Sequence, residues 1–272
     1  MVRPPQSPSD ADIAKVSHWD SVWKGSRAVP RVSPISYHHY RWRKLFAGTV
    51  GRGSRVVELG CGGSRWVPYL ARTFDCESWG IDYSQEGLRL TEQACRAEGM
   101  QCRLVFGDVF DESLLPDSYF DFVYSMGFIE HFRDPSQVTR RIARLLRPRG
   151  RVLTTLPNLT GIYGKLQQRA DPEVFAKHVI LAPQQLDEAH EAACLMPLER
   201  AHFFGCFGPG VVSYAALERQ AWGLGRMILP AVQVLQQTAC WGLRALHADF
   251  ESDRFSPYIA GIYEKVDDPE PC

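Results

Sequence analysis

Short apolar runs separated by helical patterns fill the middle of the chain. Val56, Val57 and Leu59 form a run that is rich in β-branched residues and too short for a helix, which predicts a buried strand at 55–59. Similar runs predict further strands at 78–81, 101–106, 120–124 and 151–156. Helical patterns lie between most of them, and such alternation requires a mostly parallel sheet with helices on both faces. We therefore expect a doubly wound α/β fold.

Residues that start and stop helices support this alternation. Ser84 stands where an N-cap belongs for the helix that contains Leu90, and Gly99 stands where that helix should stop. Asp134 and Pro135 form an N-cap followed by a proline at the first helical position, so another helix should begin there. These helices are expected to begin on the side of the sheet where the preceding strands end.

Polar residues lie at the carboxyl ends of the first four strands of the predicted sheet, and they are Glu58, Asp82, Asp108 and Ser125. The carboxyl ends of parallel strands meet at one edge, and ligands of such sheets bind there. Gly60, Gly62 and Gly63 follow the first strand and let a ligand approach the backbone closely. A helix predicted at 65–74 comes next, and its unpaired N–H groups suit an anionic group. We expect a ligand site at this edge.

Two common nucleotide motifs do not fit the glycine turn. A dinucleotide fingerprint, G-x-G-x-x-G, requires a third glycine where this chain has Arg65. A P-loop requires G-x-x-x-x-G-K-[ST], which the chain lacks. What the chain has is E-x-G-x-G, an acid at the end of the second strand and G-D after the third.

These segments together resemble the ordered motifs of class I S-adenosylmethionine-dependent methyltransferases, above all the group that modifies small molecules. The motifs are V-V-E-L-G-C-G-G-S, W-G-I-D-Y-S, F-G-D-V-F, F-D-F-V-Y-S-M-G-F-I-E-H-F and L-L-R-P-R-G-R-V-L. The resemblance covers residues 55–156, a little over a third of the chain. It implies a Rossmann-like, seven-stranded sheet whose last strand is antiparallel, and residues 255–266 fit that strand.

The resemblance implies S-adenosyl-L-methionine as cofactor and S-adenosyl-L-homocysteine as product. Gly60, Cys61 and Gly62 would line the methionine part of the cofactor. Glu58 would hold its amino group, and Ser125 would lie under the methionine moiety. The strand-one turn is thus expected to form the amino-acid end of the site.

The resemblance also implies a nucleoside end. Asp82 would accept hydrogen bonds from both ribose hydroxyls, and Tyr83 would flank the adenine. Asp108 would bind the adenine amino group, with the Val109 N–H at a ring nitrogen. An ionised carboxylate only accepts hydrogen bonds, which suits the first of these roles.

The expected reaction is in-line transfer of the methyl group to an O or N atom of a small-molecule acceptor. His131 is the candidate general base, because it follows the fourth strand and its ordinary pKa suits proton transfer. The alternative is that Glu130 and His131 only shape the loop. Some quinone-type O-methyltransferases of this group bind a metal with E-x-x-E-H; here Gly127 replaces the first acid, so we expect no metal site.

Charge and local sequence disfavour a nucleic-acid partner. The 31 Lys+Arg residues equal the 31 Asp+Glu residues, whereas nucleic-acid binding favours a basic excess. Amino-directed DNA and RNA enzymes show an N-P-P-Y-like run where this chain has S-M-G-F at 125–128. An RNA or protein methyltransferase and a non-catalytic module that binds S-adenosylmethionine remain the alternatives.

Cysteine usage and hydropathy predict a soluble cytoplasmic protein. The 8 cysteines are scattered without a C-x-x-C pair, which is a poor disulfide framework and a poor zinc site. The N-terminus lacks the apolar segment of a signal peptide. The longest uncharged run, 227–243, holds Pro230 and several glutamines, so we expect no transmembrane segment.

The chain is expected to divide into a disordered tail at 1–10, a helical arm at 11–53 and a methyltransferase domain at 54–272, with helical lid insertions at 159–195 and 214–250. Aromatic residues crowd the arm, where they would either cover the core or form a flap over the ligand.

A helix predicted at 222–247 has three interpretations. One face carries Val232, Leu235, Ala239, Gly242 and Leu246, and a wetter face carries Gln233, Gln237, Cys240, Arg244 and His247. The helix would pack on its own domain, form a homodimer contact or meet a hydrophobic acceptor.

Overall fold

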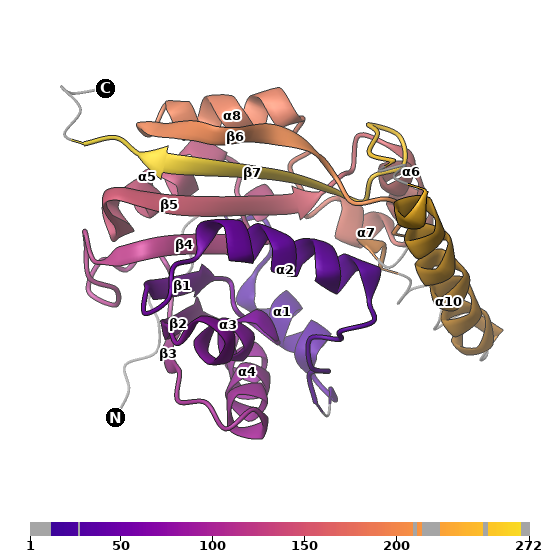
Figure 1. The fold of residues 1–272 in the computed structure, drawn as a ribbon, viewed down its shortest axis with the longest axis horizontal. Helices are drawn as coiled ribbons and strands as arrows, with labels where there is room; N and C mark the ends of the chain where they lie inside the picture. The colour runs from indigo at the N-terminus through magenta and orange to yellow at the C-terminus, as the bar shows by residue number, and fades with distance from the viewer. Residues whose placement is uncertain (1–11, 27, 209–210, 214–223, 247–249, 268–272) are drawn as a thin grey trace.

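A seven-stranded sheet runs through the part of the chain that the computed structural model describes, which is residues 12–26, 28–208, 211–213, 224–246 and 250–267. The strand order is β3-β2-β1-β4-β5-β7-β6, with β7 antiparallel to both of its neighbours (Figure 1). This confirms the predicted doubly wound, mostly parallel sheet with an antiparallel last strand. The strands are β1 Arg55–Leu59, β2 Glu77–Asp82, β3 Arg103–Phe106, β4 Phe120–Met126, β5 Leu146–Pro157, β6 Leu195–Phe204 and β7 Tyr258–Lys265. The predicted tail at 1–10 lies outside the described residues.

Helices cover both faces of the sheet (Figure 1). Their bounds are α1 Val16–Trp23, α2 Tyr37–Thr49, α3 Trp66–Phe74, α4 Gln85–Ala97, the short 3-10 helix η1 Ile129–His131, α5 Pro135–Leu145, α6 Ile162–Ala170, α7 Pro172–Phe175, α8 Pro183–Glu191 and α10 Leu224–Ala245. The predicted helix starts are confirmed: Ser84 accepts a hydrogen bond from Gly87, and Asp134 accepts one from Ser136.

The core is divided by the sheet into two apolar layers. Val57 and Leu59 pack in the layer that includes residues of α5 and α8, whereas Val56 packs in the layer built with α2 and α3. Burying a side chain of this size stabilises the fold by about 1.5–3 kcal/mol. Because both faces of β1 are covered, every position from 56 to 59 is buried, and Glu58 is the polar exception.

The segment 159–195, predicted as a helical lid, divides into parts that lie in different places. Helices α6 and α7 contact each other near the end of the sheet (Figure 1). Helix α8 instead packs on β6 and β7, where Leu186 is buried and Asp187 accepts a hydrogen bond from Tyr263 at 2.9 Å. Helix α8 therefore belongs to the layers around the sheet, because its apolar positions match that face.

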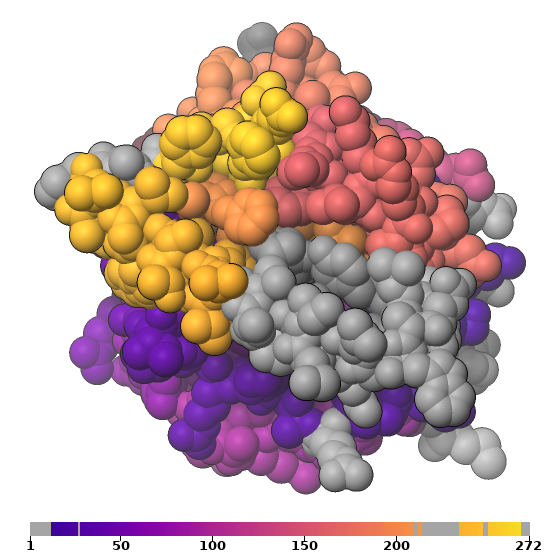
Figure 2. All heavy atoms as spheres, turned by 90° about the vertical axis from the view of Figure 1, so that its right-hand side faces the viewer, coloured from indigo at the N-terminus to yellow at the C-terminus, as the bar shows by residue number. Residues whose placement is uncertain are grey.

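Helix α10 lies at the surface beside the N-terminal part of the chain (Figure 2). The face predicted as apolar does not make this contact, since Leu235 and Leu246 are 70% and 77% exposed. The buried residues come from the polar face: Cys240 is buried, and Gln237 accepts a hydrogen bond from the Tyr37 N–H at 2.6 Å. Gln237 thus satisfies a backbone N–H at the start of α2, which a leucine at this position could not do.

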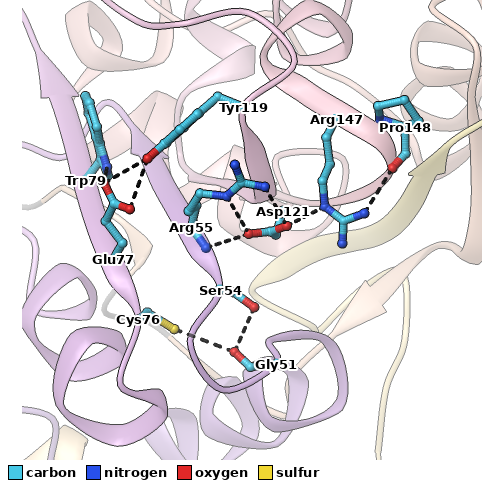
Figure 3. A network of polar contacts seen from close by, with 10 residues as sticks. All are labelled: Gly51, Ser54, Arg55, Cys76, Glu77, Trp79, Tyr119, Asp121, Arg147 and Pro148. Carbon is cyan, nitrogen blue, oxygen red and sulfur yellow. Dashed lines mark hydrogen bonds and ion pairs between the residues drawn. The ribbon is translucent and has the colours of Figure 1, made fainter.

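A polar network ties strands together at the edge opposite their carboxyl ends (Figure 3). Asp121 accepts hydrogen bonds from the Arg55 backbone at 2.7 Å and from its guanidinium at 3.1 Å, and Arg147 pairs with the same carboxylate. Partial burial acts to raise the pKa of Asp121, but these partners lower it to about 2. The network therefore stabilises the fold while Asp121 is ionised.

Across the described ranges, no helix is both long enough and apolar enough to cross a bilayer. Cys194 is disulfide-bonded, which the scattered cysteine spacing did not predict.

Candidate functional site

A cavity of about 350 Å³ lies at the carboxyl edge of the sheet. Strand order reverses here, because β1 pairs with β2 on one side and with β4 on the other. Cavities of this size suit small ligands. The predicted site residues that line it are Glu58, Gly60, Gly62, Asp82, Tyr83, Asp108, Val109 and His131.

The glycine turn after β1 brings bare backbone to the cavity. Gly60 and Gly63 have φ of 71° and 62°, a conformation that residues with a side chain rarely adopt. A Cβ atom on Gly60 would lie 2.5 Å from the ring of Phe128. The Gly60 N–H donates to the Ile81 carbonyl at 3.0 Å, which fixes the turn against the end of β2. Glycine is needed at this turn for its conformation and for space.

Glu58 is a buried carboxyl group in the cavity wall. Its Oε2 accepts hydrogen bonds from the Ser64 hydroxyl at 2.5 Å and from the Tyr124 hydroxyl at 2.8 Å. Burial raises the pKa of Glu58 to about 7, although both hydrogen bonds act in the opposite direction. A cation beside this group would favour its ionised form, so Glu58 is suited to bind an ammonium group.

Asp82 ends β2 with both carboxylate oxygens fixed by backbone donors. Oδ2 accepts from the Gly62 N–H at 2.7 Å and Oδ1 from the Ser84 N–H at 2.6 Å. Burial raises its pKa to about 6 against the effect of these bonds. Each oxygen of an ionised carboxylate has a further lone pair. Asp82 can therefore accept hydrogen bonds from two adjacent hydroxyl groups.

Asp108 and Val109 place an acceptor and a donor side by side. Asp108 Oδ1 accepts a hydrogen bond from the Phe110 N–H at 3.0 Å, which orients the carboxylate. The Val109 carbonyl accepts from Arg141 Nε at 2.8 Å, and within the described part of the chain its N–H has no hydrogen-bond partner. The edge of an adenine offers an amino donor and ring-nitrogen acceptors, which complements this pair.

Two tryptophans of α1 cover the cavity. Trp19 and Trp23 both line it, and a Cβ atom on Gly62 would lie only 2.9 Å from Trp23 Nε1. By contrast, Trp42 of α2 is buried in the core. Of the two interpretations of the arm's aromatic residues, core packing holds for Trp42, and a position over the cavity holds for Trp19 and Trp23.

Hydrogen bonds anchor α1 and the residues before it to the rim of the cavity. The Ser84 hydroxyl donates to Asp20 Oδ1 at 2.7 Å. The Tyr83 hydroxyl lies 2.5 Å from Asp12 Oδ2, and the Ile13 N–H donates to the His131 carbonyl at 2.9 Å. The arm is therefore part of the site.

His131 lies on η1 with its ring at the cavity wall. The ring is edge-on to that of Trp19, and the two ring centroids are 4.8 Å apart. Its Nδ1 is 2.8 Å from the Lys177 carbonyl oxygen. Because a carbonyl only accepts hydrogen bonds, Nδ1 carries the hydrogen and Nε2 keeps a lone pair. Burial lowers the pKa of His131 to about 3, so the ring is neutral near pH 7.

Two predicted cofactor residues do not line the cavity. The Cys61 side chain packs beneath the turn with Val67 and Cys95. The Ser125 hydroxyl is fully buried and has no hydrogen-bond partner within the described part of the chain. The cavity is also lined by residues that were not predicted from the sequence as site residues, among them Trp23, Arg65, Phe128 and Phe132. For Phe128 and Phe132, the sequence offered one indication, namely the aromatic residues in the segment that follows β4.

Residues 57–154 match a family model described as a methyltransferase domain. Methyltransferase GfsG of Streptomyces halstedii is 34% identical over 105 residues, which are 38% of this chain and 37% of that protein. The ubiquinone biosynthesis O-methyltransferase of Escherichia coli O6:H1 is 28% identical over 150 residues, 54% of this chain and 60% of that protein. Residues 57–154 therefore form a methyltransferase domain of the class I, S-adenosylmethionine-dependent type. The cofactor of this methyltransferase family is S-adenosylmethionine.

Solved structures share the fold of this methyltransferase domain. Phosphoethanolamine N-methyltransferase 2 of Haemonchus contortus, in complex with S-adenosyl-L-methionine, has a TM-score of 0.56 at 15% identity over 95% of this chain and 58% of that chain. The [4+2]-cyclase SpnF has a TM-score of 0.58 at 20% identity over 98% of this chain and 99% of that chain. At such identities the likeness shows the fold alone. The chain spans from 19% to 62% of the length of curated relatives that it matches.

Proposed function

We propose that this chain binds S-adenosylmethionine in the cavity and transfers its methyl group to an O or N atom of a small-molecule acceptor. The observation that supports this most is the convergence of Glu58, Asp82 and Asp108 on one cavity. Glu58 lies one residue before the end of β1, Asp82 ends β2 and Asp108 follows β3, and these strands are adjacent in the sheet. Three carboxyl groups around one small cavity favour a ligand that carries positive charge and several hydrogen-bond donors.

The residues present fit the cofactor part by part. Glu58 would hold the amino group of the methionine moiety, beside the backbone of Gly60 and Gly62. Asp82 would accept from the two ribose hydroxyls, using the lone pairs that its backbone donors leave free. Asp108 would accept from the adenine amino group, with the Val109 N–H at a ring nitrogen.

The cofactor, when bound, supplies a methyl group on a positively charged sulfur, so the protein's task is alignment and exclusion of water. The apolar rings of Trp19, Phe128 and Phe132 line the cavity and keep water out. His131 presents an Nε2 lone pair that can accept a hydrogen bond from an acceptor hydroxyl or amine. Because its pKa is far below 7, His131 would orient the acceptor better than it would hold the acceptor's proton.

The cofactor assignment is tested by calorimetric titration of S-adenosylmethionine. Asp82→Asn should weaken binding about 10- to 100-fold, because hydrogen bonds to a charged group contribute about 1.5–3 kcal/mol each. Glu92→Gln is the matched control, since Glu92 is an exposed carboxylate paired with Arg96 on α4. Equal affinity in the wild type and Asp82→Asn would remove the assignment.

Methyl transfer is tested with S-adenosylmethionine labelled in its methyl group and a panel of hydroxyl and amine acceptors. The alternative is a module that binds S-adenosylmethionine without transferring its methyl group. Tight cofactor binding without formation of S-adenosylhomocysteine in the presence of any acceptor would favour that alternative. Including tRNA and a protein lysate in the panel addresses the remaining alternatives.

A further inference from the structure

Three potential metal ligands meet beside the cavity, and they come from two segments of the chain. Glu130 and His131 lie on η1, and His178 lies in the segment after α7. Within the described residues, one ligand atom from each lies within 4.8 Å of the other two. The histidine rings are 4.7 Å apart between centroids. The sequence predicted no metal because Gly127 replaces an acid of a local motif, but His178 reaches the same place from 47 residues further along.

Both histidines are held in the same tautomer with a lone pair on Nε2. His131 Nδ1 lies 2.8 Å from the Lys177 carbonyl, and His178 Nδ1 lies 2.7 Å from the Val174 carbonyl. A carbonyl accepts only, so each Nδ1 carries the hydrogen and each Nε2 is free to bind an ion. This N–H to carbonyl contact is the support that metal-binding histidines in proteins almost always have.

The Glu130 carboxyl group is only partly satisfied, because backbone hydrogen bonds from Glu130 and Phe128 leave one of its oxygens without a partner. Its side chain is 2% exposed, and Oε2 has no hydrogen-bond partner within the described part of the chain. Oε1 is 3.8 Å from His131 Nε2, too far for a hydrogen bond. An unpaired buried polar group or charge is costly in either protonation state. A divalent cation between the carboxylate and the two imidazoles would remove this cost.

We propose that Glu130, His131 and His178 bind a divalent transition-metal ion of the zinc type. Two neutral imidazoles and one carboxylate suit zinc, cobalt or iron, whereas magnesium and calcium prefer oxygen ligands alone. In a tetrahedral zinc site the ligand atoms lie about 3.4 Å apart, so each side chain moves by about 1 Å or less. His131 also lines the cavity, which supplies an entry path for the ion.

Three protein ligands leave one position of a tetrahedral ion open. Given the proposed function, on which this role rests, that position would bind an oxygen atom of the acceptor beside the cofactor. The Nε2 lone pair of His131 would then hold the ion, so His131 would act on the acceptor through the metal.

The test is titration of the full-length, chelator-treated protein with Co²⁺, read by visible absorption, followed by competition with Zn²⁺. His178→Ala should weaken Zn²⁺ binding about 100-fold or more, given that losing even an outer partner of a ligand costs 10–100-fold. Glu130→Gln should act alike. His202→Ala is the matched control, because His202 also lies near a glutamate, with Nε2 3.6 Å from Glu199, but is away from the cavity. Circular dichroism checks that each variant is folded.

Equal Zn²⁺ affinity in the wild type and in folded His178→Ala would overturn the proposal, as would loss of binding in His202→Ala alone. If Glu130→Gln does not fold, half-buried His178 still provides the decisive variant. S-adenosylmethionine is titrated into the same metal-free protein. Cofactor binding without Zn²⁺ binding refutes the metal site alone, whereas Zn²⁺ binding without cofactor binding refutes the proposed function alone.

Discussion

Binding of S-adenosylmethionine should release a proton from Glu58. Burial raises the pKa of Glu58 from 4.5 to about 7, a change worth about 3 kcal/mol. At pH 6 the free protein therefore carries about 0.9 proton on this group. An ammonium group that returns the pKa to near 4.5 would release nearly all of it, but only about 0.1 proton at pH 8. Affinity should accordingly rise with pH between 6 and 7.

Calorimetry in buffers that differ in ionisation enthalpy measures this release directly. Glu58→Gln keeps the shape of the side chain and removes its titration, so it should release about 0.9 fewer protons than the wild type at pH 6. Asp82, with a pKa of about 6, contributes to both proteins and cancels in the comparison. Identical proton release by the wild type and Glu58→Gln, or proton uptake, would refute the reasoning.

The raised pKa of Glu58 also predicts how the stability of the fold depends on pH in the absence of cofactor. Its folded pKa is raised, so the native state binds the proton more tightly than the unfolded state does. Stability of the wild type should fall as pH rises from about 4.5 to about 7, by up to about 3 kcal/mol. Glu58→Gln should lack this slope in urea unfolding, and a wild-type slope of opposite sign would contradict the burial argument.

Three further predictions concern single substitutions. Asp121→Asn should destabilise the fold by about 1 kcal/mol at pH 7, a value discounted for partial exposure. The difference in stability from the wild type should vanish as pH falls through about 2, because the partners that lower the pKa of Asp121 stabilise only its ionised form. A difference that stays constant in acid unfolding would contradict this. Gly62→Ala should reduce S-adenosylmethionine affinity at least about 10-fold, since its Cβ would lie 3.0 Å from Asp82 Oδ2, whereas Gly48→Ala, with open space, should not. His131→Asn should lower turnover and leave cofactor affinity within about twofold, and a matching loss of affinity would assign the residue to cofactor binding instead.

Elements that depend on short-range sequence patterns could be predicted from the sequence. The β1 strand at 55–59 and the helix start at Asp134 and Pro135 were predicted at the bounds that the structure has. Both depend on short-range chemistry, namely an apolar run and an N-cap. The acids at strand ends were predictable for the same reason, because a parallel sheet brings all carboxyl ends to one edge.

Contacts between distant segments could not be predicted in this way. Nothing local to Trp23 indicates that its ring lies against Gly62, and nothing near His178 indicates that it faces Glu130. The periodicity of α10 was visible, but the face that contacts α2 carries Gln237, which satisfies the Tyr37 N–H of that distant helix. Hydrophobic pattern alone therefore does not decide which face of this helix is buried.

The buried carboxyl group of Glu58 also constrains how the sheet can assemble. Glu58 shares a face of β1 with Val56, and on that face the Tyr124 hydroxyl of its register partner on β4 meets it at 2.8 Å. A slip of β1 by one residue would turn every side chain to the opposite face. Glu58 would then enter the apolar layer of Val57 and Leu59, without the hydroxyl groups that solvate it, at a cost of several kcal/mol. The residue proposed to bind the cofactor thus also excludes the wrong pairing of the central strand during folding.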